Sequence, residues 1–234
     1  MIDNLCTHSS YSRKIMLESS MMYDKNSIEK SYAVMKEFYE VVKNDENKNI
    51  VQSLQFKLCN LKDINHTISR LATSVVIDDI ELYEVKSLAL LSADVKNILE
   101  KISLDKIIEI PNLDDVVKIL DPDGLRIATF YIYDSYSEEL ASLRKKLKEK
   151  DVYQEEIYNE VMRIEDEIRA ELSSKLRPYS EAMTSALNAL ADVDINIAKS
   201  LQMKELGLCF PTISSDNISS YKGIFHPEVK SILE

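Results

Sequence analysis

The residues that could carry out acid–base or metal chemistry lie far apart in this sequence. The three histidines, His8, His66 and His226, lack the closely spaced partners that build a zinc site. Asp63 and His66 have helix-face spacing, but a solvated or helix-capping pair explains them better than a pair of metal ligands. The chain has neither a glycine-rich phosphate loop nor a G-x-S-x-G nucleophile elbow. We therefore expect no catalytic residue, no metal site and no cofactor site in this chain.

A short basic cluster is the best candidate for a binding site. It could contact phosphate or a partner protein, although a solvated helix face also explains it. Its members are Arg144, Lys145, Lys146 and Lys148. A run of carboxylates follows, which we interpret as a solvated helix face. That run comprises Glu155, Glu156, Glu160, Glu165, Asp166 and Glu167.

Three tyrosines precede the basic cluster. Tyr131, Tyr133 and Tyr136 could in principle offer rings on which nucleic-acid bases stack. Packing between neighbouring elements of the fold is the interpretation that we favour for them.

The charged residues belong to two helices that the pattern predicts. Apolar residues recur every three or four positions from about Tyr153 to Leu206, which is the helical period. A helix of that length would measure about 75 Å. Lys204 and Gly207 mark its end, because glycine readily adopts the left-handed conformation that closes many helices. Pro178 lacks an amide hydrogen and clashes with a carbonyl of the preceding turn, so we expect a bend there.

A shorter, antiparallel helix comes before the long one. Residues 135–138 read Ser-Tyr-Ser-Glu and fit a capping box at its start. Leu140, Leu143 and Leu147 then form a narrow apolar stripe, and Lys148–Val152 leaves only a short connection. This pair of helices could act as a lever between distant places, or it could simply complete a helical bundle.

The N-terminal part of the chain contains shorter amphipathic segments. Each has its apolar residues on one side, so we expect the helices to pack together as a bundle. Asp24 or Asn26 could cap one of them, and Asp78 or Asp79 another. The helices are expected at residues 9–19, 28–42, 50–58, 62–73 and 80–102.

The pattern changes after Pro111. Asp121–Gly124 reads Asp-Pro-Asp-Gly, which is a strong turn signal. It separates Val116–Leu120 from Leu125–Tyr133, and both are rich in β-branched or aromatic residues. We therefore expect one small β-hairpin that packs on the helices. The irregular stretch Ser214–Glu234 should be less stable than the helices.

Composition limits the class of protein. The chain has 234 residues and a formal net charge of −11, which argues against nonspecific nucleic-acid binding. Cys6, Cys59 and Cys209 form no C-x-x-C pair and indicate reduced thiols in the cytoplasm. No apolar run approaches the ~20 residues of a membrane helix. With only three glycines and many good helix formers, the sequence predicts an all-α helical bundle with a long antiparallel helix pair.

Several short motifs follow one another along the chain. They are Cys6–Leu17, Ile28–Phe38, Leu61–Leu71, Leu187–Lys199, Cys209–Pro211 and Gly223–Pro227. In this order they resemble the helical core and lever region of the MutS family of DNA mismatch repair ATPases. Ser12 and Phe225 depart from the glycine and the arginine that are usual in that family.

The resemblance covers about Cys6 to Val229 and agrees with the helical pattern. Together they predict a helical core at 1–110, a β-hairpin insertion at 111–134 and the lever helix pair at 135–206. Residues 207–234 would then lead into an ATPase domain outside this sequence.

The resemblance implies a noncatalytic core and lever that belongs to a longer ATPase, which would bind ATP and Mg²⁺ outside this chain. The implied partners are the ATPase domain of the same protein and, through the parent protein, a second copy. The family's DNA-contacting clamp would lie between the lever helices, but too few residues follow Lys148 to form it. We therefore expect weak or no DNA binding by this chain, and no membrane contact. The alternative is a self-standing helical module for interaction or dimerisation.

Overall fold

The computed structural model describes residues 5–148, 154–214 and 218–226. It confirms the all-α fold, and none of the described residues lies in a β-strand. Short 3-10 helices (η) accompany the α-helices. In chain order the elements are α1 (Ser10–Glu18), α2 (Lys25–Lys43), η2 (Asp45–Asn47), α3 (Lys48–Leu58), α4 (Asn65–Ala72), α5 (Asp79–Lys101), α6 (Asp114–Leu120), η3 (Asp134–Tyr136), α7 (Glu138–Leu147), α8 (Gln154–Leu176), η4 (Arg177–Tyr179) and α9 (Ser180–Leu206).

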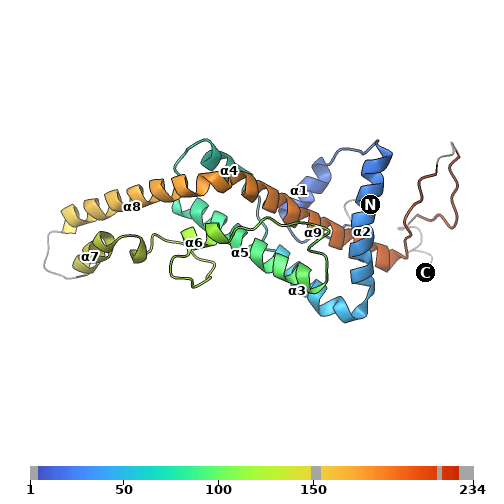
Figure 1. Cartoon of the computed structure of the whole chain (residues 1–234), viewed down its shortest axis with the longest axis horizontal. Coiled ribbons are helices and arrows are strands. Elements are labelled where there is room, and N and C mark those ends of the chain that lie inside the picture. The colour runs from blue at the N-terminus through green and yellow to red at the C-terminus, as the bar shows by residue number, and fades with distance from the viewer. Residues whose placement is uncertain (1–4, 149–153, 215–217, 227–234) are drawn as a thin grey trace.

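Helix α9 forms the centre of the molecule. Helices α1 to α5 all pack against it (Figure 1). Its middle is completely buried at Ala186, Leu187, Leu190, Ala191 and Val193. Each fully buried leucine or valine contributes roughly 1.5–3 kcal/mol relative to an exposed one, so these residues are a main source of stability. The N-terminal segments thus form the bundle that their one-sided patterns predict.

Side-chain caps fix the starts of three helices where the sequence predicts them. Ser9 Oγ accepts a hydrogen bond from the amide of Ser12 at 2.9 Å and begins α1. The Asp24 side chain caps α2 in the same way. Asp78 and Glu81 form a reciprocal capping box at the start of α5. These caps confirm the predicted starts near Ser9, Asp24 and Asp78.

The predicted long helix is a rod with an interruption at Pro178. Helices α8 and α9 follow each other through the 3-10 turn η4, which contains this proline. Figure 1 shows the two helices as one arched rod. Gly207 ends α9 with φ 63° and ψ 38°, the left-handed conformation expected of it. The C-terminal cap is therefore confirmed, and at Pro178, where a bend is predicted, the helix is interrupted by a 3-10 turn.

The predicted β-hairpin is wrong, because its first strand lies within helix α6. The side chain of Asn112 accepts a hydrogen bond from the amide of Asp114 at 2.7 Å, which favours a helical turn. Helix α6 packs on α5, and its buried residues are 7% exposed or less. Packing thus overrides the preference of β-branched residues for strands. The buried residues are Val116, Val117 and Leu120.

The turn expected between the two strands does form. The amide of Gly124 donates a hydrogen bond to the carbonyl of Asp121 at 2.9 Å, and Gly124 has a φ of +66°. Residues 125–133, predicted as the second strand, form an irregular segment, because the first strand that would have paired with them is helical.

The start of α7 also differs from the prediction. Ser137, not Ser135, is the cap, and its Oγ accepts a hydrogen bond from the amide of Leu140 at 3.2 Å. Ser135 lies inside the preceding turn η3. The connection between α7 and α8 at 149–153 and the end of the irregular C-terminal stretch lie outside the described residues. Within the described residues, no helix is both long and apolar enough to cross a membrane.

Candidate functional site

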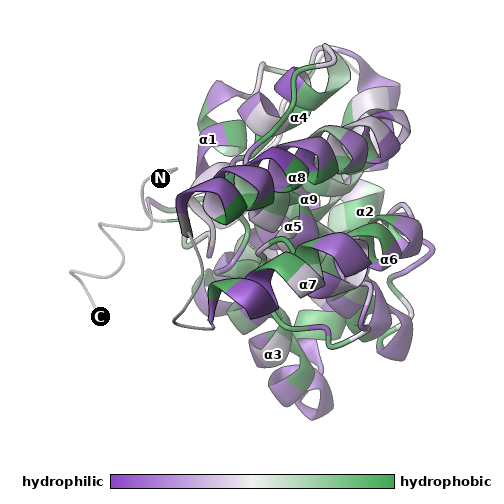
Figure 2. Cartoon of the chain, turned by 90° about the vertical axis from the view of Figure 1, so that its left-hand side faces the viewer, coloured by the Kyte–Doolittle hydropathy of each residue, from purple (hydrophilic) through white to green (hydrophobic). Residues whose placement is uncertain are grey.

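Helices α7 and α8 form a two-helix arm at one end of the molecule (Figure 1). The C-terminal segment, defined as the described residues after α9 (207–214 and 218–226), lies at the opposite end. The arm comprises residues 138–148 and 154–176, and Figure 2 views the molecule from this end. Leu140 on α7 and Val161, Ile164 and Ile168 on α8 are buried, each at 6% exposure or less. The predicted apolar stripes therefore bury against one another, and the antiparallel pair is an ordered unit.

Arg144, a predicted binding residue, points into the arm. Its Nη1 donates hydrogen bonds to the carbonyl of Ile132 at 2.8 Å and to Asp134 Oδ1 at 2.5 Å. Its Nη2 donates to Glu165 Oε1 at 2.7 Å. Burial alone would lower the pKa of Arg144, but the hydrogen bonds to Glu165 and Asp134 outweigh burial and raise it. The guanidinium thus holds the two arm helices together.

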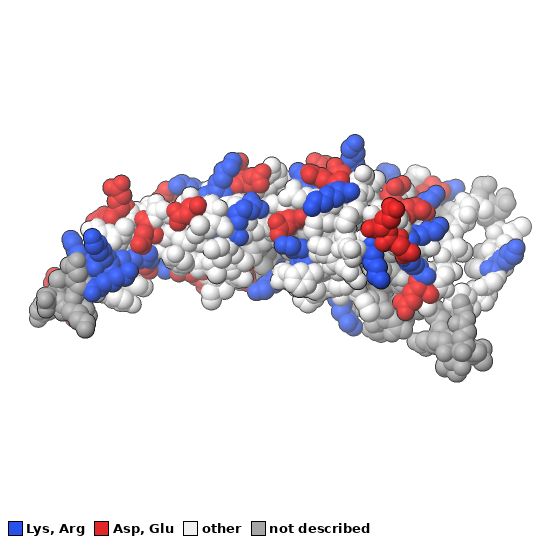
Figure 3. Space-filling model, turned by 90° about the horizontal axis from the view of Figure 1, so that it is seen from below, with Lys and Arg blue, Asp and Glu red and all other residues white. Residues whose placement is uncertain are grey.

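The other members of the basic cluster lie in the open. Lys145, Lys146 and Lys148 are exposed at the end of α7. In Figure 3 lysine and arginine side chains gather at this end of the molecule. Their ammonium groups can meet an anion, and they also interact favourably with the carbonyl groups that end α7.

Most of the predicted acidic run on α8 is paired with arginines of the same helix. Arg163 donates to Glu160 at 2.6 and 3.0 Å and also bonds Glu167. Arg169 donates to Asp166 at 2.7 Å. Exposed pairs of this kind add little stability, but they reduce the negative potential of the helix face.

Two contacts fasten the arm to the helical core near the middle of the rod. Arg169 binds the carboxylate of Asp79 through two nitrogens, at 2.8 and 3.2 Å, at the start of α5. This hydrogen bond is the chief cause that raises the pKa of Arg169. One turn further along α8, Ser173 Oγ accepts a hydrogen bond from the amide of Ile77 at 3.1 Å. The second half of α8 is therefore fixed in direction relative to the core.

A strap, defined as residues 121–136, connects α6 with α7 and carries a buried ion pair. Lys86 Nζ on α5 donates to Asp121 Oδ1 at 3.0 Å and to Tyr133 Oη at 3.0 Å. The Lys86 side chain is 0% exposed and that of Asp121 is 2% exposed. The amide of Arg126 donates to the other oxygen of Asp121 at 2.6 Å. Local sequence patterns could not indicate this pair, because 35 residues separate its members.

The tyrosines of the strap mostly pack as predicted. Tyr133 is buried, and the Oη of Tyr136 donates to the carbonyl of Ile119 at 2.9 Å. Tyr131 is 57% exposed and its ring centroid lies 4.4 Å from that of Tyr133. These rings therefore stabilise the strap, and only Tyr131 faces solvent to a large extent.

At the other end of the rod, α9 is fastened close to the C-terminal segment. Lys204 Nζ donates to Asp45 Oδ1 at 2.9 Å, which links the end of α9 to η2. Just beyond Gly207, the ring of Phe210 lies edge-on to those of Tyr32 and Tyr39, with centroids 6.4 and 5.8 Å apart. The start of the C-terminal segment is thus docked on α2.

A histidine that looked isolated in the sequence meets a buried carboxylate. The side chain of Asp194 on α9 is 0% exposed and accepts hydrogen bonds from the amides of His8 and Ser9 at 2.9 to 3.1 Å. The ring Nδ1 of His8 lies 3.1 Å from Asp194, and its Nε2 lies 3.0 Å from the Gln55 amide nitrogen. Since Asp194 meets the amides that lead into α1, this group anchors that helix on α9.

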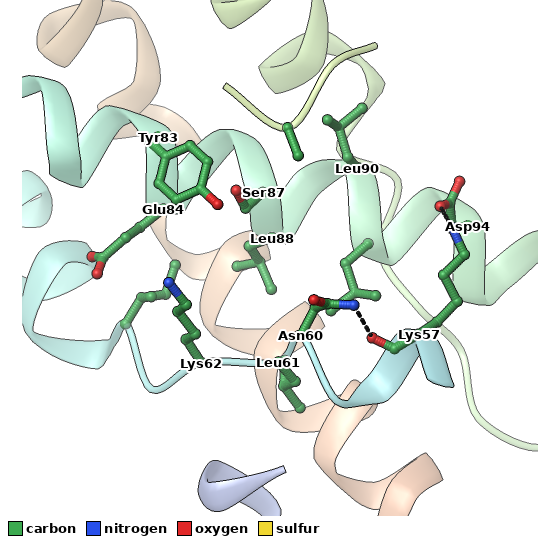
Figure 4. Close-up of a pocket in the computed structure, with 13 residues that line it drawn as sticks. Lys57, Asn60, Leu61, Lys62, Tyr83, Glu84, Ser87, Leu88, Leu90 and Asp94 are labelled. Carbon is green, nitrogen blue, oxygen red and sulfur yellow. Dashed lines mark hydrogen bonds and ion pairs between the residues drawn. The ribbon is translucent and has the colours of Figure 1, made fainter. Parts of the chain in front are cut away.

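A cavity of about 230 Å³ lies beside α5 (Figure 4). Lys57 and Asp94 close one side through an ion pair of 2.6 Å, and Lys62 lies 5.6 Å from the ring centroid of Tyr83. Ser87 Oγ is buried there without a hydrogen-bond partner among the described residues. None of the residues predicted as a binding site lines this cavity.

No three metal-ligating side chains come together in the part of the chain that the structure describes. The arm and its attachment to the core are thus the candidate functional site. Neither a protein-family model nor a curated protein matches this chain.

Proposed function

We propose that this chain is a noncatalytic lever. The helical core holds a two-helix arm, and the rod of α8 and α9 couples a contact at the arm tip to a domain that follows the C-terminal segment. The observation that carries the proposal is the course of this rod. It begins in the arm, passes through the core and ends where the C-terminal segment starts (Figure 1).

A lever must resist bending between its ends, and the contacts along the rod support that requirement. Arg169 and Ser173 attach α8 to the core, and Lys204 attaches the end of α9. Between these points α9 is surrounded by other helices. If one end of the rod moves, the rod should therefore move as a unit instead of bending between its ends.

We further propose that the domain after the C-terminal segment is an ATPase of the MutS type. The sequence resemblance supports this proposal. It implies the order of core, arm, rod and C-terminal segment along the chain. In this proposal ATP and Mg²⁺ bind that domain and not the present chain. On the basis of the same resemblance, we propose that the parent protein pairs with a second copy of itself and that it acts in DNA mismatch repair.

A self-standing interaction module is the second candidate function. Tyr158 and Met162 lie one helical turn apart on α8 and are 56% and 38% exposed. Apolar side chains at this spacing can receive a helix of a partner protein or of a second copy. This function needs the arm but no ATPase.

Two experiments test the proposal. Calorimetric titration with Mg-ATP at millimolar concentrations should give no saturable heat, because the chain has no phosphate loop. Micromolar affinity would overturn the noncatalytic lever. The coding sequence downstream of Glu234 tests the parent protein: a phosphate loop soon after His226 supports the ATPase, whereas an unrelated domain there would favour the interaction module.

A further inference from the structure

A path of hydrogen bonds and ion pairs links helix α5 to the arm and returns through the strap to a second position on α5. Starting at Asp79, the path passes to Arg169 and Glu165 on α8, and from there to Arg144 on α7. Arg144 reaches the strap at the carbonyl of Ile132. The next residue of the strap, Tyr133, returns to α5 at Lys86. Two adjacent residues of the strap are therefore bound to different parts of the molecule. Ile132 is bound by Arg144 of the arm, and Tyr133 is bound by Lys86 of the core.

The core end of the strap is buried, and both charges of its ion pair are hydrogen-bonded. Lys86 meets Asp121 and Tyr133, and Tyr133 Oη donates to the carbonyl of Thr129 at 3.1 Å. Burial would raise the pKa of Asp121, but the Arg126 amide and Lys86 outweigh burial and lower it. A buried ion pair tolerates little displacement, because losing one partner leaves the other charged and unsatisfied. The strap therefore has one well-defined position on α5.

At the arm end of the strap, Arg144 supplies the side-chain hydrogen bonds, and η3 also packs against α7. Arg144 donates to the strap at Ile132 and Asp134 and to α8 at Glu165, so the same guanidinium joins the strap to both arm helices. Its side chain is 24% exposed, which leaves it partly open to solvent. Because this contact lies at a partly solvated side chain, it can open locally while the buried core stays folded.

We propose that the strap is a latch that fastens α7 to the core, so that release at Lys86 or at Arg144 loosens α7, while Arg169 and Ser173 keep α8 attached to the core. This inference rests on the proposed lever and names the contacts that hold its arm. Coupling between two sites needs an element whose position both of them bias, and Ile132 and Tyr133 are neighbours in such an element because one is bound by the arm and the other by the core. In the released state α7 would move while helices α1 to α3 keep their packing.

Amide hydrogen exchange in α7 tests the latch. Tyr133→Phe keeps the ring and removes the hydroxyl that accepts from Lys86 and donates to the carbonyl of Thr129. The hydrogen-bond and ring partners of Tyr133 all lie outside α7, so an effect on α7 would have to pass through the strap. Arg144→Gln removes the charged contact at the other end. We expect Tyr133→Phe to speed exchange of residues 138–148 by about tenfold. Arg144→Gln removes three hydrogen bonds and should speed it by more. We expect the double variant to match Arg144→Gln, because one opening already frees α7.

Two conservative variants serve as controls. Tyr131→Phe lies in the strap and Lys146→Gln in α7, and both side chains are exposed, so neither should change exchange in α7. The latch is overturned if Tyr133→Phe leaves α7 at the wild-type rate. It is also overturned if the two effects multiply, as independent sites do, or if exchange in α1 to α3 rises equally. If the exchange experiment contradicts the latch, the proposed lever is unaffected. If Mg-ATP binds this chain, the lever is contradicted and the latch is not.

Discussion

Arg144 on α7 donates a hydrogen bond to Glu165 on α8, with Nη2 and Oε1 2.7 Å apart. The two side chains are 24% and 15% exposed, so water competes only partly for this contact. From the sequence, Arg144 is a possible partner of phosphate, and Glu165 is interpreted as part of a solvated helix face. In the folded chain they neutralise each other and hold the arm together.

We predict that the arm tip does not grip DNA. Among the residues that the structure describes at the tip, Lys145, Lys146 and Lys148 are exposed to phosphate, in a chain with a net charge of −11. Fluorescence anisotropy with duplex and mismatched DNA at ~100 mM salt should show no binding below about 10 µM. Sub-micromolar binding that disappears when the three lysines are changed to alanine would contradict this prediction.

Pro178→Ala should stabilise the chain. Pro178 is exposed, and alanine would restore an amide that can donate to the preceding turn. The gain in the free energy of unfolding should be about 1–2 kcal/mol, below the full ~3 kcal/mol for proline in a helix, since α4 packs against η4. Denaturation followed by circular dichroism measures it, with Ser174→Ala as the control. Destabilisation would mean that packing requires the interruption.

Lys86→Met should be among the most damaging single substitutions. It leaves the buried carboxylate of Asp121 without its cation, which costs about 3–5 kcal/mol in the free energy of unfolding. Adding Asp121→Leu should restore part of that loss, because a buried charge no longer lacks its partner. Lys101→Met, at an exposed position of the same helix, is the control and should change stability by less than about 0.5 kcal/mol. Equal effects of Lys86→Met and Lys101→Met would refute the role of the buried pair.

The stability of the chain should fall in acid, partly through Asp121. Its pKa is lowered in the folded state by the hydrogen bonds from Arg126 and Lys86, which outweigh burial. Its contribution is therefore present above the unfolded-state pKa of about 3.9 and is lost as the pH falls through the folded-state pKa. Urea denaturation between pH 6 and pH 3 should show a shallower loss for Asp121→Asn than for the wild type. Parallel curves for the two proteins would contradict this assignment.

Helix positions could be predicted from the sequence because their causes are local. The caps at Ser9, Asp24 and Asp78 act within three residues, and Gly207 acts on the turn directly before it. The same local reasoning failed at Val116–Leu120. There the turn signal was correct, but burial against α5 decided between helix and strand.

The candidate site was predictable only in part, because its contacts join distant residues. The arm helices and the cluster around Arg144 follow from periodicity and charge. The ion pair of Lys86 with Asp121 and the contact of His8 with Asp194 could not be predicted in this way. The partners lie 35 and 186 residues apart. A lysine in the middle of an amphipathic helix looks solvated until the element that covers it is known.

The distance across the interruption of the rod tests the lever most directly. Spin labels at Asn159 on α8 and Asp192 on α9, both exposed positions, would lie up to about 50 Å apart along the rod. Cys6, Cys59 and Cys209 are exposed and would be changed to serine for this measurement. Double electron–electron resonance should give a single narrow distance distribution near that length, unchanged in Lys146→Gln. A distribution as broad as that of a flexible linker would show that the arm and the core are not one rigid lever.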